Sequence, residues 1–454
     1  MIKSINPATG KEIKSYNEMS EEEIKKILSQ VNESFVDWNK TGFDTRKLKM
    51  KKAAGILRNK KEFLAGIMTL EMGKPIEQSK AEIEKCAWVC DYFAENAEKF
   101  LEDEIIKSDA SKSYVTYRPL GVVLAVMPWN FPFWQVFRFA APSLMAGNAG
   151  VLKHSSNVMG CALAIEDIFK EAGFPENLFR TLIVSSKHVK DIIENKNIAA
   201  VTLTGSVPAG KSVASVAGGA LKKTVMELGG SDPYLILDDA DLDKTAEICV
   251  KARLVNSGQS CIAAKRFIVV ESIYKKFEEL FVEKMSREKM GDPFDASNNI
   301  GPQAREDLRD ELHSQVKQSI DNGAKLLLGG KIPPIKGAYY PATVLSNVST
   351  GMPAYNEELF GPVAALIRVK DEKSGIIAAN DTIFGLGAAV FTSDFERGER
   401  IAKEELSAGC CFVNDLVRSD PRLPFGGIKE SGYGRELSLF GIREFMNLKT
   451  VYVK

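Results

Sequence analysis

The sequence is poor in histidine and carries no excess of either charge, and both shortages narrow the possible functions. Only three histidines occur, which leaves few candidates for a histidine-rich metal site or for the base of a Ser-His-Asp triad. Lysine plus arginine and aspartate plus glutamate both number 60. Because there is no basic excess and no lysine cluster, we expect neither a nucleic-acid partner nor a membrane surface.

The sequence also lacks a long hydrophobic run. Its most apolar stretch, residues 121–147, contains Asn130, Arg138 and three prolines, which a membrane-spanning helix would not carry. The first residues lack the apolar segment of a secretory signal. We therefore expect a soluble protein of the cytoplasm.

The seven cysteines form no recognisable framework. An odd number of cysteines in a long chain favours free thiols over disulfides. Cys86 and Cys90 lie four residues apart in a helical pattern with no His or Cys pair near them, so no metal site is expected. Cys410 and Cys411 fit packing within a strand.

The order of predicted helices and strands indicates an α/β protein of two or three domains. The first hundred residues are predicted to be mainly helical, with a capping box at 20–23 and helical runs over about 46–72 and 76–101. From residue 115 to 228 short β-rich runs alternate with helical runs, and a second such series covers about 234–414. This alternation predicts parallel sheets.

Three short segments carry residues suited to catalysis. Cys261 ends a polar, glycine-containing segment whose N–H groups can favour a thiolate, although most single cysteines are buried apolar residues. Glu227 follows an apolar strand and precedes two glycines, at the sheet edge where ligands bind. Burial would raise the pKa of Glu227 and make it a base, unless it is a hydrogen-bonded strand-end carboxylate. Asn130, between two prolines, is either rigidly placed to donate to an oxyanion or part of an ordinary turn.

With these and other segments, the chain resembles the aldehyde dehydrogenase superfamily. The family's characteristic motifs occur in the family's order along nearly the whole chain. They are the Pro-Trp-Asn-Phe-Pro turn at 128–132, Lys153, Thr204-Gly205-Ser206 with Gly210, Glu-Leu-Gly-Gly at 227–230, Gly-Gln-Ser-Cys at 258–261, Glu-Leu-Phe-Gly-Pro at 358–362, Asn414 and Pro-Phe-Gly-Gly at 424–427.

The resemblance implies an enzyme that oxidises an aldehyde to a carboxylic acid. Cys261 would attack the aldehyde to form a thiohemiacetal, Asn130 and the Cys261 N–H would hold the oxyanion, and hydride transfer would leave a thioester. Glu227 would activate the water that hydrolyses the thioester. Acylating, CoA-dependent relatives lack this base, so its presence favours a free acid product.

The resemblance also implies how a nicotinamide cofactor is held. Glu358 would bind the nicotinamide ribose and Phe360 would pack beside it, and the adenosine and pyrophosphate region would be lined by Trp129, Lys153, Gly205, Ser206 and Gly210. The usual G-x-G-x-x-G is absent from the first βα turn, and the family does without it.

Ser156 sets the expected choice of cofactor. Many NAD-dependent members have a glutamate here, after Lys-Pro-Ser, whereas this chain reads Lys-His-Ser-Ser over 153–156. The serine leaves room and a donor for a 2′-phosphate, and Lys153 adds a positive charge. We predict NADP as the cofactor, with NAD as the second option.

Residues 205–212 match the G-x-x-x-x-G-K-S pattern of P-loop nucleotide hydrolases, after a predicted strand. Alternatively, Gly205 and Gly210 begin a helix whose N-terminus faces the cofactor pyrophosphate. An NTPase would leave Cys261, Glu227 and Asn130 without a role, so we expect the second arrangement. A catalytically silent relative would be expected to have lost Cys261 or Glu227, and both are present.

The predicted substrate tunnel contains charged side chains. Five residues are expected to line it: Trp134, Gln135, Arg138, Arg418 and Ser419. Arginine in a tunnel favours a substrate with a carboxylate, because the guanidinium can form two hydrogen bonds to it, unless each arginine is a surface or interdomain residue.

The chain also resembles the short succinate-semialdehyde dehydrogenase branch, in segments 131–139, 153–154 and 263–266. We therefore predict oxidation of succinate semialdehyde to succinate, with a broad-specificity aliphatic aldehyde dehydrogenase as the alternative.

The resemblance implies an aldehyde dehydrogenase-like fold. A Rossmann-type cofactor domain would comprise 1–100 and 120–228, an α/β catalytic domain 229–430, and a small β oligomerisation segment 101–119 with 431–454. Alternating residues in the last segment predict an exposed edge strand that pairs with another subunit, giving a homodimer or homotetramer.

Overall fold

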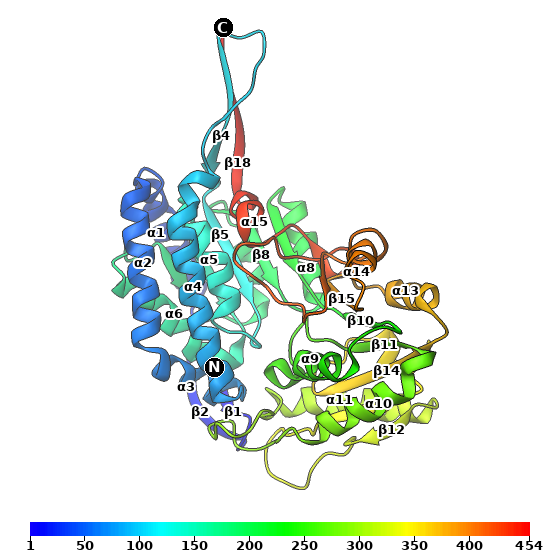
Figure 1. Cartoon of the computed structure of the whole chain (residues 1–454). Coiled ribbons are helices and arrows are strands. Elements are labelled where there is room, and N and C mark those ends of the chain that lie inside the picture. Colours follow the sequence, from blue (N-terminus) through cyan, green and yellow to red (C-terminus); the bar gives the residue numbers. More distant parts are fainter.

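The structure, a computed structural model, describes residues 1–454 and begins with a β-hairpin followed by a layer of helices (Figure 1). The hairpin is formed by β1 (Ile2–Asn6) and β2 (Lys11–Tyr16), and the helices are α1 (Glu21–Trp38), α2 (Phe43–Asn59), α3 (Lys61–Met72) and α4 (Ile76–Phe100). The predicted capping box is present, since the Ser20 side chain accepts from the Glu23 N–H. The hairpin was not predicted, and the run over 46–72 is two helices because the backbone leaves helical geometry at Lys60.

A six-stranded sheet forms the core of the N-terminal half, with strands in the order β17-β9-β8-β5-β6-β7. Its strands are β5 (Val122–Met127), β6 (Ala149–His154), β7 (Phe179–Thr181), β8 (Ile198–Thr204), β9 (Lys223–Glu227) and the antiparallel β17 (Gly432–Tyr433). The connecting helices are α5 (Trp134–Ala146), α6 (Met159–Glu171), α7 (Val189–Glu194) and α8 (Val207–Gly219). The predicted alternation over 115–228 is confirmed. The Val-Val-Leu-Ala run of β5 is fully buried, as expected for a parallel sheet covered on both faces.

A seven-stranded sheet forms the second half, in the order β12-β13-β14-β11-β10-β15-β16. Its strands are β10 (Pro233–Ile236), β11 (Arg266–Val270), β12 (Lys325–Leu328), β13 (Thr343–Ser346), β14 (Val363–Val369), β15 (Gly387–Phe391) and β16 (Cys410–Val413), and only β12 is antiparallel. The helices around it are α9 (Leu242–Leu254), α10 (Glu271–Ser286), α11 (Glu306–Asp321), α12 (Pro353–Asn356), α13 (Glu372–Asn380) and α14 (Phe395–Arg400). Two apolar clusters of 22 buried residues each form the core of this half.

A three-stranded antiparallel sheet projects from the body of the molecule (Figure 1). It consists of β3 (Glu104–Ile105), β4 (Lys112–Pro119) and β18 (Met446–Val453), which follows α15 (Ser438–Glu444). Its exposed apolar side chains are Ile105, Leu448, Tyr452 and Val453. No helix of the structure combines the length and hydropathy needed to cross a bilayer.

Candidate active site

Cys261 lies just beyond a tightly folded turn that follows α9. Three successive residues, Asn256, Ser257 and Gly258, have left-handed backbone angles, with φ of 52°, 54° and 77°. Gly258 tolerates no side chain, because a Cβ atom there would lie 2.2 Å from the Gly361 carbonyl oxygen. Asparagine and glycine are among the residues that adopt this conformation most readily. The turn therefore fixes the cysteine firmly relative to the second sheet.

Asn130 is tied directly to this turn. Its Nδ2 donates to the Gln259 carbonyl at 3.0 Å, and Asn256 Nδ2 donates to the Asn130 carbonyl at 2.7 Å. Gln135 Nε2 donates to Asn130 Oδ1 at 3.0 Å and so fixes which way the carboxamide faces. A carboxamide has two N–H donors, so one donor of Asn130 stays available. The backbone N–H of Cys261 likewise has no acceptor within the chain.

A buried glutamate on α4 holds the 128–132 turn from one side. Glu82 Oε1 accepts from the backbone N–H groups of Phe133 and Trp134, both at 2.9 Å, and the other carboxylate oxygen forms an ion pair with buried Lys74. These contacts supply acceptors for N–H groups at the start of α5, which no preceding turn can satisfy. Glu82 therefore positions the helix that carries Gln135.

His154, at the end of β6, holds the same turn from the other side. Its Nε2 lies 2.9 Å from the Pro132 carbonyl oxygen, and its Nδ1 lies 3.2 Å from the Met127 carbonyl oxygen and 2.9 Å from the Ser155 nitrogen. Burial lowers the pKa of His154 to about 4. The ring is therefore neutral near pH 7, and its contacts link the cofactor-side segment after β6 to the turn that carries Asn130.

The thiol of Cys261 is partly buried and faces several charged groups. Burial is the main reason that its pKa is raised to about 12, and the carboxyls of Glu358 and Glu227 raise it further. The cations of Lys265 and Arg138 oppose this rise. Cys261 is thus a neutral thiol near pH 7, and Glu227 lies close enough to influence it.

Glu227, at the end of β9, is a buried carboxyl without a hydrogen-bond partner. It is 2% exposed, and neither carboxyl oxygen receives a hydrogen bond from the chain. Burial raises its pKa well above the ordinary value, with Glu436 adding to the rise and Arg138 opposing it. Gly426 keeps space beside it, because a Cβ atom there would lie 2.7 Å from Glu227 Oε1. A buried carboxyl held this way can exchange a proton with a nearby water.

Arg138 lines the cavity but its charge is already matched. It forms a buried ion pair with Glu436 and donates to Thr204 Oγ1 at 3.3 Å. Arg418 is 54% exposed and is paired with Asp415, with 2.6 Å between Nη1 and Oδ2. Both predicted tunnel arginines therefore have carboxylate partners within the chain.

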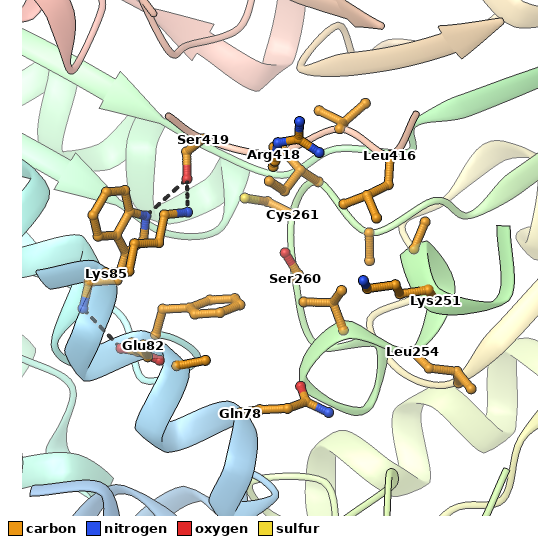
Figure 2. Close-up of a pocket in the computed structure, with 18 of the residues that line it drawn as sticks. Gln78, Glu82, Lys85, Lys251, Leu254, Ser260, Cys261, Leu416, Arg418 and Ser419 are labelled. Carbon is orange, nitrogen blue, oxygen red and sulfur yellow. Dashed lines mark hydrogen bonds between the residues drawn. The ribbon is translucent and has the colours of Figure 1, made fainter. Parts of the chain in front are cut away.

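A cavity of about 800 Å³ lies between the two halves and reaches the Cys261 thiol (Figure 2). All five predicted tunnel residues line it: Trp134, Gln135, Arg138, Arg418 and Ser419. Apolar walls come from Phe131, Val417 and Phe425. On one side, Ser419 Oγ accepts from Trp134 Nε1 at 3.1 Å and from Lys85 Nζ at 2.8 Å. Lys85 was not among the residues predicted to line the tunnel.

The predicted cofactor residues occupy the carboxyl edge of the first sheet and the facing part of the second half. Trp129 and Phe360 meet edge to face, with ring centroids 5.7 Å apart. Glu358 accepts from the Gly230 N–H at 3.1 Å and pairs with Lys265. Lys153 is half-buried at the end of β6, and this burial lowers its pKa.

The start of α8 and the segment after β6 suit a dinucleotide phosphate. Gly205 and Ser206 form the two-residue connection from β8 to α8, and no side chain caps the first N–H groups of that helix. Free N–H groups at a helix N-terminus bind phosphate. Gly210 lets the helix approach Leu228, where a Cβ atom would lie 2.4 Å from Cδ2. Ser156 is exposed, with no carboxylate at its position.

This geometry excludes a P-loop. A phosphate-cradling loop needs the residues between its two glycines to be outside the helix, but here α8 already begins at Val207. Lys211, in the position of the P-loop lysine, is exposed and pairs with Glu430 at 2.9 Å. The sequence match over 205–212 is coincidental.

Several residues that support the site were not anticipated. Lys265 is fully buried, donates to the carbonyl groups of Ser260 and Cys261 at 2.8 and 2.6 Å, and so joins the cysteine to Glu358. Lys85 and Glu82 carried one available signal: both lie beside the apolar face of a helix, where a charged residue needs a partner.

Comparisons with known proteins agree with this geometry. Residues 1–451 match the aldehyde dehydrogenase family model. The chain is 49% identical over 452 residues to a probable NADP⁺-type succinate-semialdehyde dehydrogenase of Synechocystis, covering 100% of this chain and 99% of that protein. It is 47% identical to the NAD(P)⁺-type succinate semialdehyde dehydrogenase of Escherichia coli, covering 99% of this chain and 97% of that protein.

A solved structure agrees as well. The succinic semialdehyde dehydrogenase of Streptococcus pyogenes, in complex with NADP⁺, superimposes with a TM-score of 0.98 at 36% identity, and all of both chains is covered. The predicted fold and the resemblance to the short succinate-semialdehyde dehydrogenase branch are thereby confirmed. The chain belongs to the aldehyde dehydrogenase family.

Proposed function

We propose that this protein oxidises succinate semialdehyde to succinate with NADP, and more slowly with NAD. The observation that carries the proposal is that the Cys261 thiol lines the cavity, while the Asn130 amide is bound to the Gln259 carbonyl two residues before it and the Glu227 carboxyl lies near enough to raise the pKa of the thiol. The names of the relatives support the same substrate and the same cofactor.

Cys261 is the proposed nucleophile. As the sulfur bonds to the carbonyl carbon, the thiol proton is released and the carbonyl oxygen becomes an oxyanion. The two donors left free, one on Asn130 Nδ2 and one on the Cys261 backbone, can stabilise that oxyanion. A bound oxidised nicotinamide would supply the hydride acceptor, and loss of hydride from the former aldehyde carbon would leave a thioester on Cys261.

Glu227 is the proposed base for thioester hydrolysis. It removes a proton from a water molecule, the oxygen of which attacks the thioester carbon, and the C–S bond breaks to release the acid. Burial raises the pKa of Glu227, so the carboxylate form that can act as a base becomes more abundant as the pH rises. Release of acid should therefore accelerate with rising pH.

The cofactor site is proposed on the features described above. Gly205, Ser206 and the first N–H groups of α8 would bind the pyrophosphate, with Gly210 allowing close packing of the helix. Lys153 and Ser156 would bind the 2′-phosphate of NADP by donating hydrogen bonds to it. Trp129 would line the adenosine and pyrophosphate region, while Glu358 and Phe360 would hold the nicotinamide ribose and ring.

The proposed domain roles follow the sheets. Residues 1–100 and 120–228 would bind the cofactor, and residues 229–430 would supply the nucleophile. The segments 101–119 and 431–454, which contain the strands of the projecting sheet and its exposed apolar side chains, would pair subunits into a homodimer or homotetramer. The seven unpaired cysteines fit a reducing compartment such as the cytoplasm.

A panel of initial rates tests the proposal. Succinate semialdehyde, butanal and hexanal would each be assayed with NADP and NAD by the absorbance of the reduced cofactor. We expect the highest kcat/KM for succinate semialdehyde with NADP. Higher kcat/KM values for both neutral aldehydes would instead favour a broad aliphatic aldehyde dehydrogenase and reject the proposed substrate.

A further inference from the structure

Lys265 is a fully buried cation whose contacts all lie inside the protein, and it does not line the cavity. Its Nζ donates to the Ser260 carbonyl at 2.8 Å and to the Cys261 carbonyl at 2.6 Å. The same Nζ lies 3.3 Å from Glu358 Oε1. An ammonium group has three N–H donors, so these three acceptors leave none for a substrate or cofactor. Any role of Lys265 in the reaction must therefore act through its neighbours.

The contact with Ser260 fixes the direction of one proposed oxyanion donor. The Ser260 carbonyl and the Cys261 N–H belong to one trans peptide unit, in which the N–H points opposite to the C=O. Lys265 Nζ and the Ala263 N–H hold the carbonyl, at 2.8 and 3.1 Å, and so occupy both of its lone pairs. The Cys261 N–H therefore faces away from the lysine, and it has no acceptor within the chain.

A cation bound to this carbonyl also strengthens the donor at the other end of the peptide unit. Hydrogen bonds in a chain polarise one another, and a bond from a charged donor is stronger than one from a neutral donor. Both effects are larger in a dry site than in water, and Ser260 and Lys265 are both buried. When negative charge develops on the aldehyde oxygen, the Cys261 N–H is therefore a better donor than an ordinary backbone N–H.

The contact with Glu358 acts on the cofactor side of the site. Glu358 Oε1 accepts from the Gly230 N–H at 3.1 Å and faces Lys265, whereas Oε2 accepts no hydrogen bond from the chain. The side chain of Glu358 is 20% exposed. Gly229 keeps space beside Oε2, because a Cβ atom there would lie 2.5 Å from it. A carboxylate held at one oxygen presents the other to a hydroxyl group, as the proposed contact with the nicotinamide ribose requires.

The positions of Lys265 and Glu358 depend on each other. Glu358 is the only carboxylate that forms an ion pair with this lysine. Burial lowers the pKa of Lys265 and Arg253 adds to this effect, whereas the carboxyls of Glu358 and Asp232 oppose it. A buried charge without its partner is costly, so a shift of either side chain draws the other with it. One ammonium group thus connects the carboxylate proposed to hold the ribose with the peptide unit proposed to hold the oxyanion.

We propose that Lys265 is a positioning residue that orients the Cys261 N–H toward the aldehyde oxygen and, through Glu358, fixes the nicotinamide half of the cofactor. This proposal rests on the function proposed above, because both groups belong to that site. Loss of Lys265 should therefore weaken the binding of one half of the dinucleotide and not of the other, and it should slow the first chemical step.

The first test measures cofactor binding without catalysis. Isothermal titration calorimetry would give the Kd of NADP⁺ and of adenosine 2′,5′-bisphosphate, the half of NADP that lacks the nicotinamide ribose. We expect Lys265→Met to raise the Kd of NADP⁺ about 5- to 30-fold and to change that of the bisphosphate less than about twofold.

The matched control is Arg46→Met. Arg46 is also a buried cation that donates to three backbone carbonyl groups, those of Trp38, Asn39 and Met145, but it does not line the cavity. Its loss therefore costs similar buried contacts elsewhere in the molecule. Arg46→Met should leave both Kd values near those of the parental protein.

The second test measures the oxyanion donor, with NADP⁺ and succinate semialdehyde both saturating. The rate of cofactor reduction in the first turnover should fall about 10- to 100-fold in Lys265→Met. It should fall less in Lys265→Gln, because the amide can still donate to a carbonyl group. Lys265→Gln also carries the binding test if Lys265→Met does not fold, since it lacks the charge that holds Glu358.

Two results would overturn the proposal while leaving the proposed function in place. One is equal weakening of NADP⁺ and the bisphosphate in a Lys265 variant, and the other is a parental first-turnover rate in Lys265→Met. A parental protein that binds neither ligand, or reduces no NADP⁺ with the aldehyde, would instead reject the proposed function itself.

Discussion

Separating Arg138 from Glu436 should change both stability and the chemistry of Glu227. Both members of this pair are at least 95% buried, and both act electrostatically on Glu227. The variants Glu436→Gln and Arg138→Met each leave one member without its partner, and the double variant Arg138→Met/Glu436→Gln removes both charges.

The two single variants should not cost the same. In Glu436→Gln a buried guanidinium remains that cannot lose its proton, so we expect a loss of about 3–5 kcal/mol in the free energy of unfolding. In Arg138→Met the remaining carboxyl can take up a proton, and burial already raises the pKa of Glu436. Arg138→Met should therefore lose less of the free energy of unfolding than Glu436→Gln. The double variant should be more stable than Glu436→Gln, because it leaves no unpaired buried charge.

The effects on Glu227 should have opposite signs. Glu436 raises the pKa of Glu227 and Arg138 lowers it, so Glu436→Gln should lower that pKa and Arg138→Met should raise it. Urea unfolding measures the stabilities, and the pH dependence of acid release after a single turnover measures the shifts. Equal destabilisation by both single variants, or shifts of the same sign, would refute this account of the cluster.

Two other changes have expected results. Ser156→Glu should lower kcat/KM with NADP by at least about tenfold, because the new carboxylate repels the 2′-phosphate. The kcat/KM with NAD should stay nearly unchanged. Steady-state rates with each cofactor measure both values. Gly258→Ala should cost about 1–3 kcal/mol of stability, measured by urea unfolding, and reduce activity, because its Cβ would meet the Gly361 carbonyl in a left-handed residue.

Local patterns in the sequence were sufficient to predict the elements that carry the chemistry. The strands leading to the 128–132 turn and to Glu227 are short β-branched runs between turn residues, and they formed as β5 and β9. The α/β alternation followed from the same signals. The β1–β2 hairpin was missed because its residues are largely polar and only partly buried, which leaves little alternation to detect.

Ion pairing could not be predicted, because it depends on contacts between distant segments. Arg138 and Glu436 are nearly 300 residues apart in sequence, and only the folded chain shows that they are partners. For the same reason the sequence could not show that Arg418 forms an ion pair with Asp415, whereas Lys85 donates to the Ser419 hydroxyl. The P-loop match failed because pattern alone does not reveal where a helix begins.

The central claim is that Cys261 becomes covalently bonded to the substrate and that Glu227 is needed to release the acid. Glu227→Gln protein, mixed with NADP and succinate semialdehyde, should reduce one cofactor per active site and then slow by orders of magnitude. Mass spectrometry of its peptides should find a succinyl group on Cys261, and the double variant Cys261→Ser/Glu227→Gln should show neither the adduct nor the burst. Full-speed cofactor reduction by Cys261→Ser protein, or a succinyl group on a different residue, would contradict the mechanism.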